Sequence, residues 1–454
     1  MTRSRWFVVT VACVVAGGLS LRAPARAAAP KPNVIVVLVD ALRADILGAY
    51  GYKKRATTPN LDRFAGRSVV WENALSQNAW TVPCVASTFT GVDSQAHRTL
   101  RYQAKENIEM DTLSLAHNTI AEQFQSAGYT TAAFLKSVVI DSSRGFSQGF
   151  DTFKVVGGKD QAWGYSAGQL NDVALPWIAS QKGAAKPFFV YLHFMDVHSP
   201  YKAPEPYYTK YKVGESKLTG AHNEIEAMAK ANIVPTAGDI ERLYGLYDAE
   251  MEYMDAEFGR LMTELIKSGL ESNTIVVFTA DHGEAFYEHQ QWFHGNLYQE
   301  NIRIPMILKI PGVAAGRMTG YSQQIDLAPT LAELAGVALS PDWMGHSQVP
   351  GMKAGRAVTD VVYSEYIEQR TVVDPNGMKL IVNDGPTKLY DLAADPNETK
   401  NLATSRGADV TRLRALLDAR FAKGKAAGAK FPASAPSTLS AEQVEALKAL
   451  GYLE

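Results

Sequence analysis

Two runs of apolar, mostly β-branched residues, each ending in an aspartate, constrain the fold of this chain more than any other feature. Residues 33–39 lead to Asp40, and residues 274–280 lead to Asp281. A run that is apolar on both faces predicts a strand in the middle of a parallel sheet. Ligands of such sheets bind beyond the carboxyl ends of the strands, where both aspartates stand. The sequence therefore predicts a functional site around these two side chains.

Further strands and one long helix are predicted within the same domain. Residues 188–194 and 304–309 are strand candidates. Apolar side chains recur every three to four positions over residues 243–266, and Gly269 then ends the predicted helix. Strands that alternate with helices indicate a layered α/β domain, which we place at residues 31–350.

The chain after residue 350 changes to short strand-like runs with turn residues between them. These runs are residues 361–366, 371–373, 378–382 and 388–392. They predict a small antiparallel subdomain at residues 351–422. Residues 423–454 are predicted to be a linker rich in Ala, Lys, Pro and Ser, followed by a short helix that Ser440 opens with a capping box to Gln443.

The N-terminus has the pattern of an export signal. Arg3 and Arg5 precede an uncharged apolar run, and small residues up to Ala27 offer cleavage sites. Residues 1–27 are thus predicted to be a signal peptide, the mature protein to be periplasmic or extracellular, and no stable transmembrane span to remain after cleavage. With 45 basic and 47 acidic residues, nucleic acid is not an expected partner. The two cysteines, Cys13 and Cys84, exclude a disulfide framework.

Histidines gather after the second aspartate-ending run. Three histidines and a glutamate follow Asp281 closely, namely His282, Glu284, His289 and His294. His193 and His198 follow another predicted strand, and a polar stretch at residues 214–239 is expected to form a lid, a loop near His198 or a surface insertion. Imidazole and carboxylate are ligands of divalent metals. A polar loop with satisfied histidines is the alternative, but two aspartates at strand ends favour a metal site.

A second cluster lies at residues 78–91, where Thr81 and Pro83 precede a helix start rich in small residues. A hydroxyl at a helix N-terminus can meet an anion held by the helix dipole and free backbone N–H groups. Taken alone, Thr81 is better explained as a helix cap.

The ordered set of motifs over residues 32–403 resembles the sulfatases, a family of the alkaline phosphatase superfamily. This resemblance implies an α/β fold with a central mixed, mostly parallel sheet flanked by helices and a small antiparallel C-terminal subdomain. The motifs are Val39–Asp45, Thr58–Asp62, Trp80–Pro83, Ala127–Ala132, His193–Tyr201, Asp281–Glu284, Leu389–Leu392, Asp395–Pro396 and Asn401–Leu402.

The resemblance also implies roles for individual residues. Asp40, Asp281 and His282 would hold one divalent cation (calcium, magnesium, manganese or zinc) together with the oxygen of Thr81, which stands at the nucleophile position. The groups that would contact the substrate are His198, His294 and, on a looser match, Lys136. Glu284 and His289 would orient these residues through hydrogen bonds without contacting the metal or the substrate.

The chain departs from the family pattern near the nucleophile. Sulfatases carry Cys, sometimes Ser, followed by x-Pro-x-Arg, and this residue is oxidised to formylglycine. Here Thr81 takes its place, Val85 replaces the Arg, and Ala41 replaces a frequent second Asp. Cys84 lacks the Pro two positions on. Threonine has a single hydroxyl and cannot collapse to an aldehyde to expel sulfate, but it can form a phosphothreonine ester that water cleaves.

These observations predict a metal-dependent hydrolase that attacks a phosphate or phosphonate ester through Thr81. The expected substrate is an anionic ester of a small molecule, a glycan or a lipid. Three alternatives stay open: a true sulfuric ester hydrolase, an envelope phosphotransferase, and a catalytically degenerate protein that binds anionic glycans or lipids.

Overall fold

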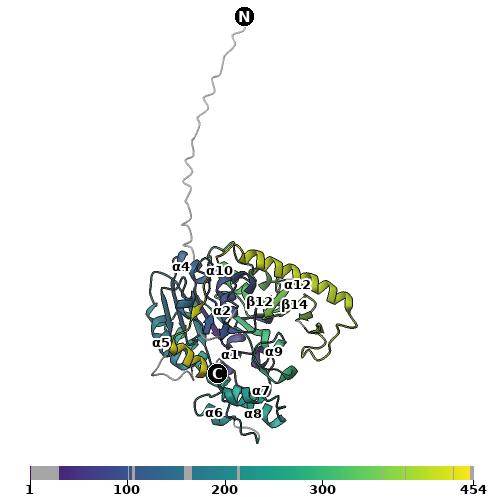
Figure 1. The fold of residues 1–454 in the computed structure, drawn as a ribbon. Coiled ribbons are helices and arrows are strands. Elements are labelled where there is room, and N and C mark those ends of the chain that lie inside the picture. Colours follow the sequence, from purple (N-terminus) through teal and green to yellow (C-terminus); the bar gives the residue numbers. More distant parts are fainter. Residues whose placement is uncertain are drawn as a thin grey trace. The chain divides into compact units, whose positions relative to one another are not determined.

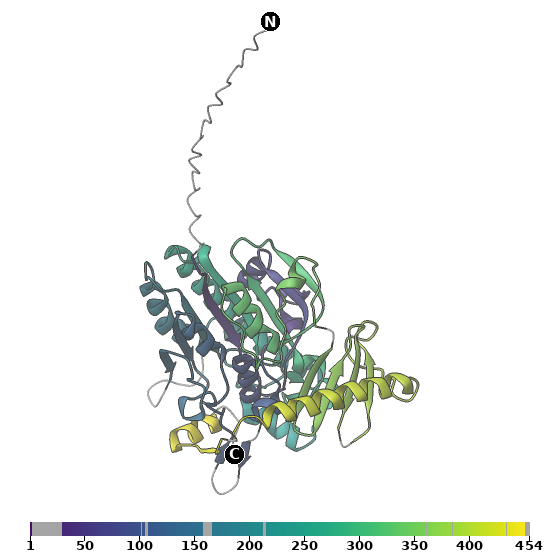
Figure 2. The same cartoon turned by 90° about the horizontal axis from the view of Figure 1, so that it is seen from above.

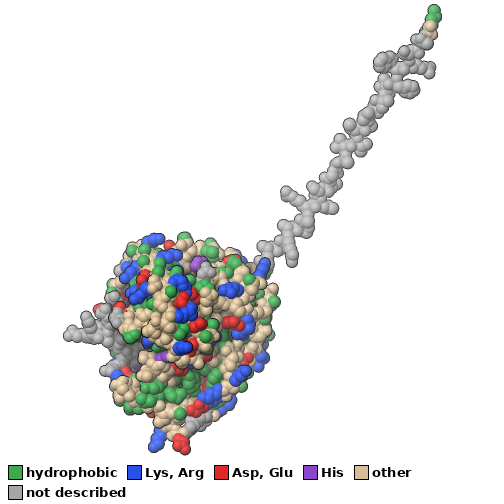
Figure 3. All heavy atoms as spheres, turned by 90° about the vertical axis from the view of Figure 1, so that its right-hand side faces the viewer, with side chains coloured by type: hydrophobic (Ala, Val, Ile, Leu, Met, Phe, Trp, Pro, Cys, Tyr) green, Lys and Arg blue, Asp and Glu red, His purple; other side chains and the backbone are tan. Residues whose placement is uncertain are grey.

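The computed structural model describes Met1 and residues 30–449, apart from residues 101, 105–107, 158–165, 212–214, 360, 384 and 433. The predicted signal peptide lies outside the described residues. The chain divides into a short unit, Met1–Lys31, and a compact unit, Pro32–Glu454, which holds every described helix and strand. None of the described helices combines the length and apolar character that a bilayer span requires. Basic and acidic side chains both occur across the face shown in Figure 3.

An eight-stranded mixed sheet forms the centre of the compact unit (Figures 1 and 2). Its strand order is β12 (Gly316–Gln323), β2 (Val69–Leu75), β11 (Arg303–Lys309), β8 (Thr274–Ala280), β1 (Asn33–Val39), β7 (Phe188–Phe194), β5 (Thr130–Leu135) and β6 (Thr152–Val155). The five strands from β8 to β6 are parallel, whereas β11 runs antiparallel to both of its neighbours. The α/β fold class and the four strands predicted in this domain are confirmed.

Helices cover both faces of this sheet, which explains the continuous apolar strands. Side chains of adjacent strand residues point to opposite faces. Phe188 packs against Trp177 of α5 (Ser166–Ser180), whereas its neighbour Phe189 stacks on Phe124 of α4 (Ile120–Ser126). In each of the strands β1, β7 and β8, all seven residues are consequently buried.

The long helix predicted from apolar spacing is α8 (Ala237–Lys267), and it packs against α5 and against α1 (Pro59–Ala65). Thr236 and Asp239 form a capping box at its start. A second group of helices consists of α2 (Thr81–Thr90), α4 and α10 (Leu327–Ala335). The shorter elements are α3 (Ser94–His97), α6 (Tyr207–Lys210), α7 (His222–Lys230), α9 (Gln299–Ile302), α11 (Val349–Met352), β9 (Ala285–Phe286) and β10 (Trp292–Phe293).

The C-terminal part contains the predicted small antiparallel sheet. Its strands are β13 (Val362–Tyr366), β14 (Gln369–Val373), β15 (Met378–Val382) and β16 (Lys388–Asp391). Helix α12 (Gly407–Gly428) packs on β14 and β15, as Figure 2 shows. The linker predicted to begin at Lys423 is therefore wrong over its first residues, because α12 continues to Gly428.

The last described elements lie against the first half of the chain. Strand β17 (Ser437–Thr438) pairs with β4 (Ile108–Met110), which also pairs with β3 (Tyr102–Ala104). The terminal helix is α13 (Ala441–Ala449). Its predicted capping box is confirmed, since the Gln443 backbone N–H donates to Ser440 Oγ and the Ser440 N–H donates to Gln443 Oε1.

Candidate functional site

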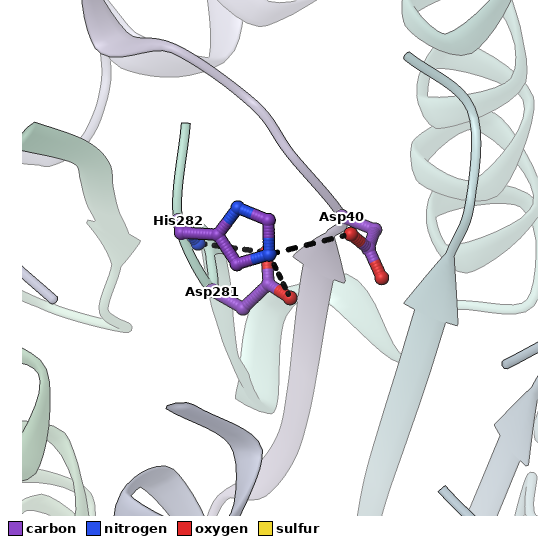
Figure 4. A group of neighbouring side chains, drawn as sticks. All are labelled: Asp40, Asp281 and His282. Carbon is purple, nitrogen blue, oxygen red and sulfur yellow. Dashed lines mark hydrogen bonds and ion pairs between the residues drawn. The ribbon is translucent and has the colours of Figure 1, made fainter. Parts of the chain in front are cut away.

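Three acidic or imidazole side chains meet at the carboxyl ends of β1 and β8. These strands are parallel neighbours with Val39 opposite Ala280, so Asp40 and Asp281 follow side by side. His282 comes next in the chain, and all three side chains are buried. His282 Nε2 lies 3.5 Å from Asp281 Oδ2 and 3.8 Å from Asp40 Oδ1, and dashed lines in Figure 4 join this nitrogen to both carboxylates.

The two carboxylates differ in their electrostatic state. Burial alone would raise both pKa values. Asp40 nevertheless has a pKa well below its usual range, because His193 donates a hydrogen bond to it and His198 and His282 lie nearby. Burial, together with the charge of Asp40, raises the pKa of Asp281 to about 7. The two buried carboxylates thus lie side by side with no lysine or arginine among their described contacts.

The donor set fits a divalent cation. Asp281 Oδ2 is buried and has no hydrogen-bond partner within the described part of the chain. His282 Nδ1 lies 2.9 Å from the carbonyl oxygen of Gly283, so Nδ1 carries the proton and the Nε2 lone pair faces the two carboxylates. Burial also lowers the pKa of His282, which favours the neutral ligand form. Asp40, Asp281 and His282 are consequently the residues that would hold the metal.

His193 is a site residue to which the sequence analysis assigned no role. It is the sixth residue of β7, and its Nε2 lies 3.2 Å from Asp40 Oδ2. Its Nδ1 lies 3.0 Å from the hydroxyl of Tyr191. Because this hydroxyl can donate to Nδ1, His193 is held in the tautomer that donates from Nε2 to Asp40. A histidine at the end of a predicted parallel strand was the signal that pointed to this position.

Thr81 is the first residue of α2 and faces the same group. Its Oγ1 lies 3.4 and 3.5 Å from the two carboxylate oxygens of Asp40 and 3.3 Å from His282 Nε2. The side chain is fully buried. The residue at the N-cap position is Trp80, and no side chain caps the helix there. The Thr81 hydroxyl is therefore directed at the candidate metal ligands rather than at the helix terminus.

His198 and His294 line the other side of the site. The ring of His294 lies 4.4 Å from that of His282 and 5.3 Å from that of His198, between centroids. His294 Nδ1 lies 3.2 Å from Glu284 Oε1, and the Tyr201 hydroxyl donates to Glu284 Oε2 at 3.0 Å. Burial raises the pKa of Glu284 to about 7, while burial and the charge of His198 lower the pKa of His294 to about 3. Glu284 thus orients His294 from behind.

Lys136 follows β5 at the same edge of the sheet. Its side chain is fully buried, and its ammonium group donates to the side-chain oxygen of Gln169 on α5. Burial lowers the pKa of Lys136 to about 8, opposed by the charge of Asp196.

The structure does not bring His289 into this group. The ring of His289 stacks on Tyr298 at 3.6 Å, and its Nε2 lies 3.9 Å from Glu300 Oε2. His289, Glu300 and Glu398 are close enough together to hold a metal ion. However, the buried ammonium group of Lys379 lies 2.6 Å from Glu398 Oε1 and already neutralises one carboxylate. The described contacts of His289 are therefore with Tyr298 and Glu300, not with the residues of the Asp40 site, where the resemblance implies a supporting role.

Comparisons with known proteins identify the family of this chain. A family model described as sulfatase matches residues 32–337, and a second, described as N-sulphoglucosamine sulphohydrolase, C-terminal, matches residues 287–425. The choline-sulfatase of Rhizobium meliloti is 25% identical over 456 residues, which cover 86% of this chain and 86% of that protein.

Solved structures share the fold. The phosphonate monoester hydrolase of Agrobacterium radiobacter has a TM-score of 0.69 at 20% identity, covering 87% of this chain and 96% of its own. A protein solved with its substrate D-glucosamine-2-N,6-O-disulfate has a TM-score of 0.70 at 21% identity, covering 87% of this chain and 98% of its own. The chain belongs to the sulfatase family of the alkaline phosphatase superfamily and is a hydrolase of sulfate or phosphate esters.

Proposed function

We propose that this protein is an exported, metal-dependent hydrolase of phosphate or phosphonate esters in which Thr81 is the nucleophile. The observation that carries the proposal is the position of Thr81 Oγ1, 3.3 Å from His282 Nε2 and 3.4 Å from Asp40 Oδ2. A hydroxyl at the start of a helix, beside buried metal-ligand side chains, is placed for in-line attack on an anionic ester.

The residues of the chain divide the reaction between them. Asp40, Asp281 and His282 would hold the divalent cation, which when bound lowers the hydroxyl pKa and offsets negative charge on the transferred group. Thr81 Oγ1, oriented by Asp40, loses its proton to solvent and forms a bond to phosphorus, while the bond from phosphorus to the leaving-group oxygen breaks. Water then attacks the phosphorus of the threonine ester, its oxygen leaves with the released phosphate or phosphonate, and one of its protons restores the Thr81 hydroxyl.

His198 and His294 face the substrate oxygens in this proposal. His198 Nδ1 lies 2.6 Å from the Ser199 carbonyl oxygen, and His294 Nδ1 lies 3.2 Å from Glu284 Oε1, so both rings are oriented through Nδ1. Burial and the charge of His198 lower the pKa of His294 to about 3, and a dianionic group beside this ring would oppose that shift. One of the two can then give a proton to the departing oxygen.

A sulfate ester is the second candidate, favoured by the names of the family model and of the choline-sulfatase relative. The residues around Thr81 argue against formylglycine chemistry. Cys84 is fully buried, its Sγ lies 3.1 Å from the Asn78 carbonyl oxygen, and burial raises the pKa of its thiol. The substrate named for the similar structure, a sulfated glucosamine, makes an anionic carbohydrate ester a candidate alongside the phosphonate esters of the hydrolase relative.

A paired turnover assay tests the nucleophile. The mature protein is assayed with added divalent metals on aryl phosphate, phosphodiester, phosphonate and aryl sulfate esters. Thr81→Ala should abolish turnover of phosphorus esters, and Thr81→Ser should retain part of it because serine offers the same hydroxyl. Turnover that survives in Thr81→Ala would reject Thr81. Loss of aryl sulfate turnover in Cys84→Ala but not in Thr81→Ala would point to Cys84 instead.

A further inference from the structure

A third histidine stands beside the site on α7, inside the stretch predicted as a loop or lid. His222 is the first residue of this helix and is partly exposed. Its ring stacks on Phe293 with centroids 4.3 Å apart and planes 19° apart. Its Nδ1 lies 2.9 Å from Ser199 Oγ. The imidazole is therefore fixed on two sides rather than free in solvent.

Both contacts of His222 lead directly to substrate-facing residues. The carbonyl oxygen of Ser199 lies 2.6 Å from His198 Nδ1, so one residue orients the rings of both His198 and His222. Phe293 immediately precedes His294 and adopts a left-handed backbone, with φ of 58°. Bulky residues rarely adopt this conformation, and it persists only where the surroundings hold it. The stacking of His222 on Phe293 is one of those holding contacts.

The groups around His222 lower its pKa, and a bound anion would act against this shift. Burial lowers the pKa of His222 to about 4, and the positive charges of His198 and His294 add to this effect. The carboxylate of Glu226 opposes it, but Glu226 is paired with Lys230 at 3.1 Å. His222 Nε2 has no hydrogen bond to any residue that the structure describes. Three imidazoles thus lie in one neighbourhood, and a bound dianion would oppose the lowered pKa values of His222 and His294.

We propose that His222 is a further substrate-binding residue, whose Nε2 donates a hydrogen bond to the anionic ester that His198 and His294 also contact. The ligand class is a phosphoryl, phosphonyl or sulfuryl group. This inference rests on the proposed location of the active site, but not on Thr81 being the nucleophile. With this role for His222, α7 contributes to substrate binding in addition to the residues at the strand ends.

Two substitutions separate binding from scaffolding. The amide nitrogen of Gln reaches the position of Nε2, whereas the Asn amide reaches the position of Nδ1. For an aryl phosphate, His222→Asn should raise KM about tenfold to hundredfold with kcat nearly unchanged, as for loss of a hydrogen bond to a charged group. His222→Gln should recover part of the loss. The opposite ranking would mean that His222 only braces Ser199, and would overturn the proposal.

Binding of inorganic phosphate gives a readout that does not depend on turnover. Calorimetric titration of the metal-loaded protein is made in the Thr81→Ala background, with and without His222→Asn. The dissociation constant should rise about tenfold with His222→Asn, and it should stay unchanged with His346→Gln, a control at an exposed histidine. Equal phosphate affinity in the His222 and control variants would refute the inference. Turnover retained by Thr81→Ala would refute only the nucleophile.

Discussion

Replacing His193 by alanine tests how the buried site holds its metal. His193 donates to Asp40 Oδ2 at 3.2 Å, and both side chains are inaccessible to solvent. Among the interactions that lower the pKa of Asp40, this hydrogen bond is the largest. Without it, burial raises the pKa of Asp40, and the carboxylate loses the partner that orients it toward the metal.

The expected magnitude follows from the kind of contact. Loss of a partner that orients a metal ligand typically weakens metal binding by about 10–100-fold, or about 1.4–2.7 kcal/mol. Because the defect is in metal affinity, saturating metal should restore most of kcat. Titration of the metal-free protein by calorimetry, and of activity against free metal, measures both effects.

A matched variant sharpens this test. Tyr191→Phe removes the hydroxyl that lies 3.0 Å from His193 Nδ1 but leaves the imidazole in place. It should weaken metal binding by a few-fold only, since the remaining effect is on the tautomer. If His193→Ala binds metal as tightly as the unmodified protein, Asp40 is not a metal ligand oriented by His193, and the reasoning about this site fails.

Three further predictions concern the residues behind the site and the C-terminal subdomain. Burial raises the pKa of Glu284 from 4.5 to about 7, so the folded protein binds this proton more tightly than the unfolded chain does. As pH rises from about 4.5 to about 7, the free energy of unfolding of the metal-free protein should therefore fall relative to that of Glu284→Gln, by at most about 3 kcal/mol. Urea unfolding at several pH values measures this difference. Identical pH profiles of the two proteins would contradict the prediction. Lys379→Met should lower the free energy of unfolding by about 3–5 kcal/mol, because it leaves the Glu398 carboxylate buried without its ion-pair partner. Adding Glu398→Gln to the same chain should restore much of this stability. If urea titrations show no such recovery, the ion pair does not stabilise the fold as argued. Leu413→Ala on α12, at a fully buried position, should destabilise by about 2–5 kcal/mol and leave KM unchanged at a temperature where the protein is folded; a shift in KM would show that α12 affects the active site.

Continuous apolar runs made the core of the fold predictable. Strands β1, β7 and β8 are apolar on both faces because α5 covers Phe188 and α4 covers Phe189. The outer strands were harder to predict, since β12 at the sheet edge has few apolar residues and β6 is short and only partly buried. The antiparallel strands after residue 350 were recognisable because turn residues separate them.

The site was predictable where residues follow strands, and less so where contacts depend on register or on distant segments. Asp40 and Asp281 could be paired because both end parallel strands. The contact of His193 with Asp40 depends on the β1–β7 register, which no local pattern specifies. His222 belongs to a stretch predicted as a lid, a loop or a surface insertion, yet it forms a helix, and its bond to Ser199 spans 23 positions.

The departures from the family pattern fit together as one variant site. Ala41 adopts a left-handed backbone, with φ of 56°, and its N–H donates to Asp281 Oδ1 at 3.1 Å, so its backbone orients a proposed metal ligand. Val85 is fully buried in the apolar core, one turn after Thr81. A charged group at position 85 would carry a large desolvation cost there. The apolar surroundings of Val85 therefore do not suit the arginine that accompanies an oxidised residue in the family pattern. They are compatible with an unmodified hydroxyl at Thr81.

The same arrangement argues against a protein that has lost catalysis. Asp40 and Asp281 are buried together, and Asp281 Oδ2, which accepts no hydrogen bond from the described residues, carries a desolvation cost. A divalent cation would offset it, and the free energy of metal binding would then add to the stability of the fold. We therefore expect metal to raise the unfolding temperature of the unmodified protein and of Thr81→Ala, but not of Asp281→Ala, as measured by calorimetry. Equal unfolding temperatures with and without metal would leave the buried carboxylates unexplained and would favour the non-catalytic alternative.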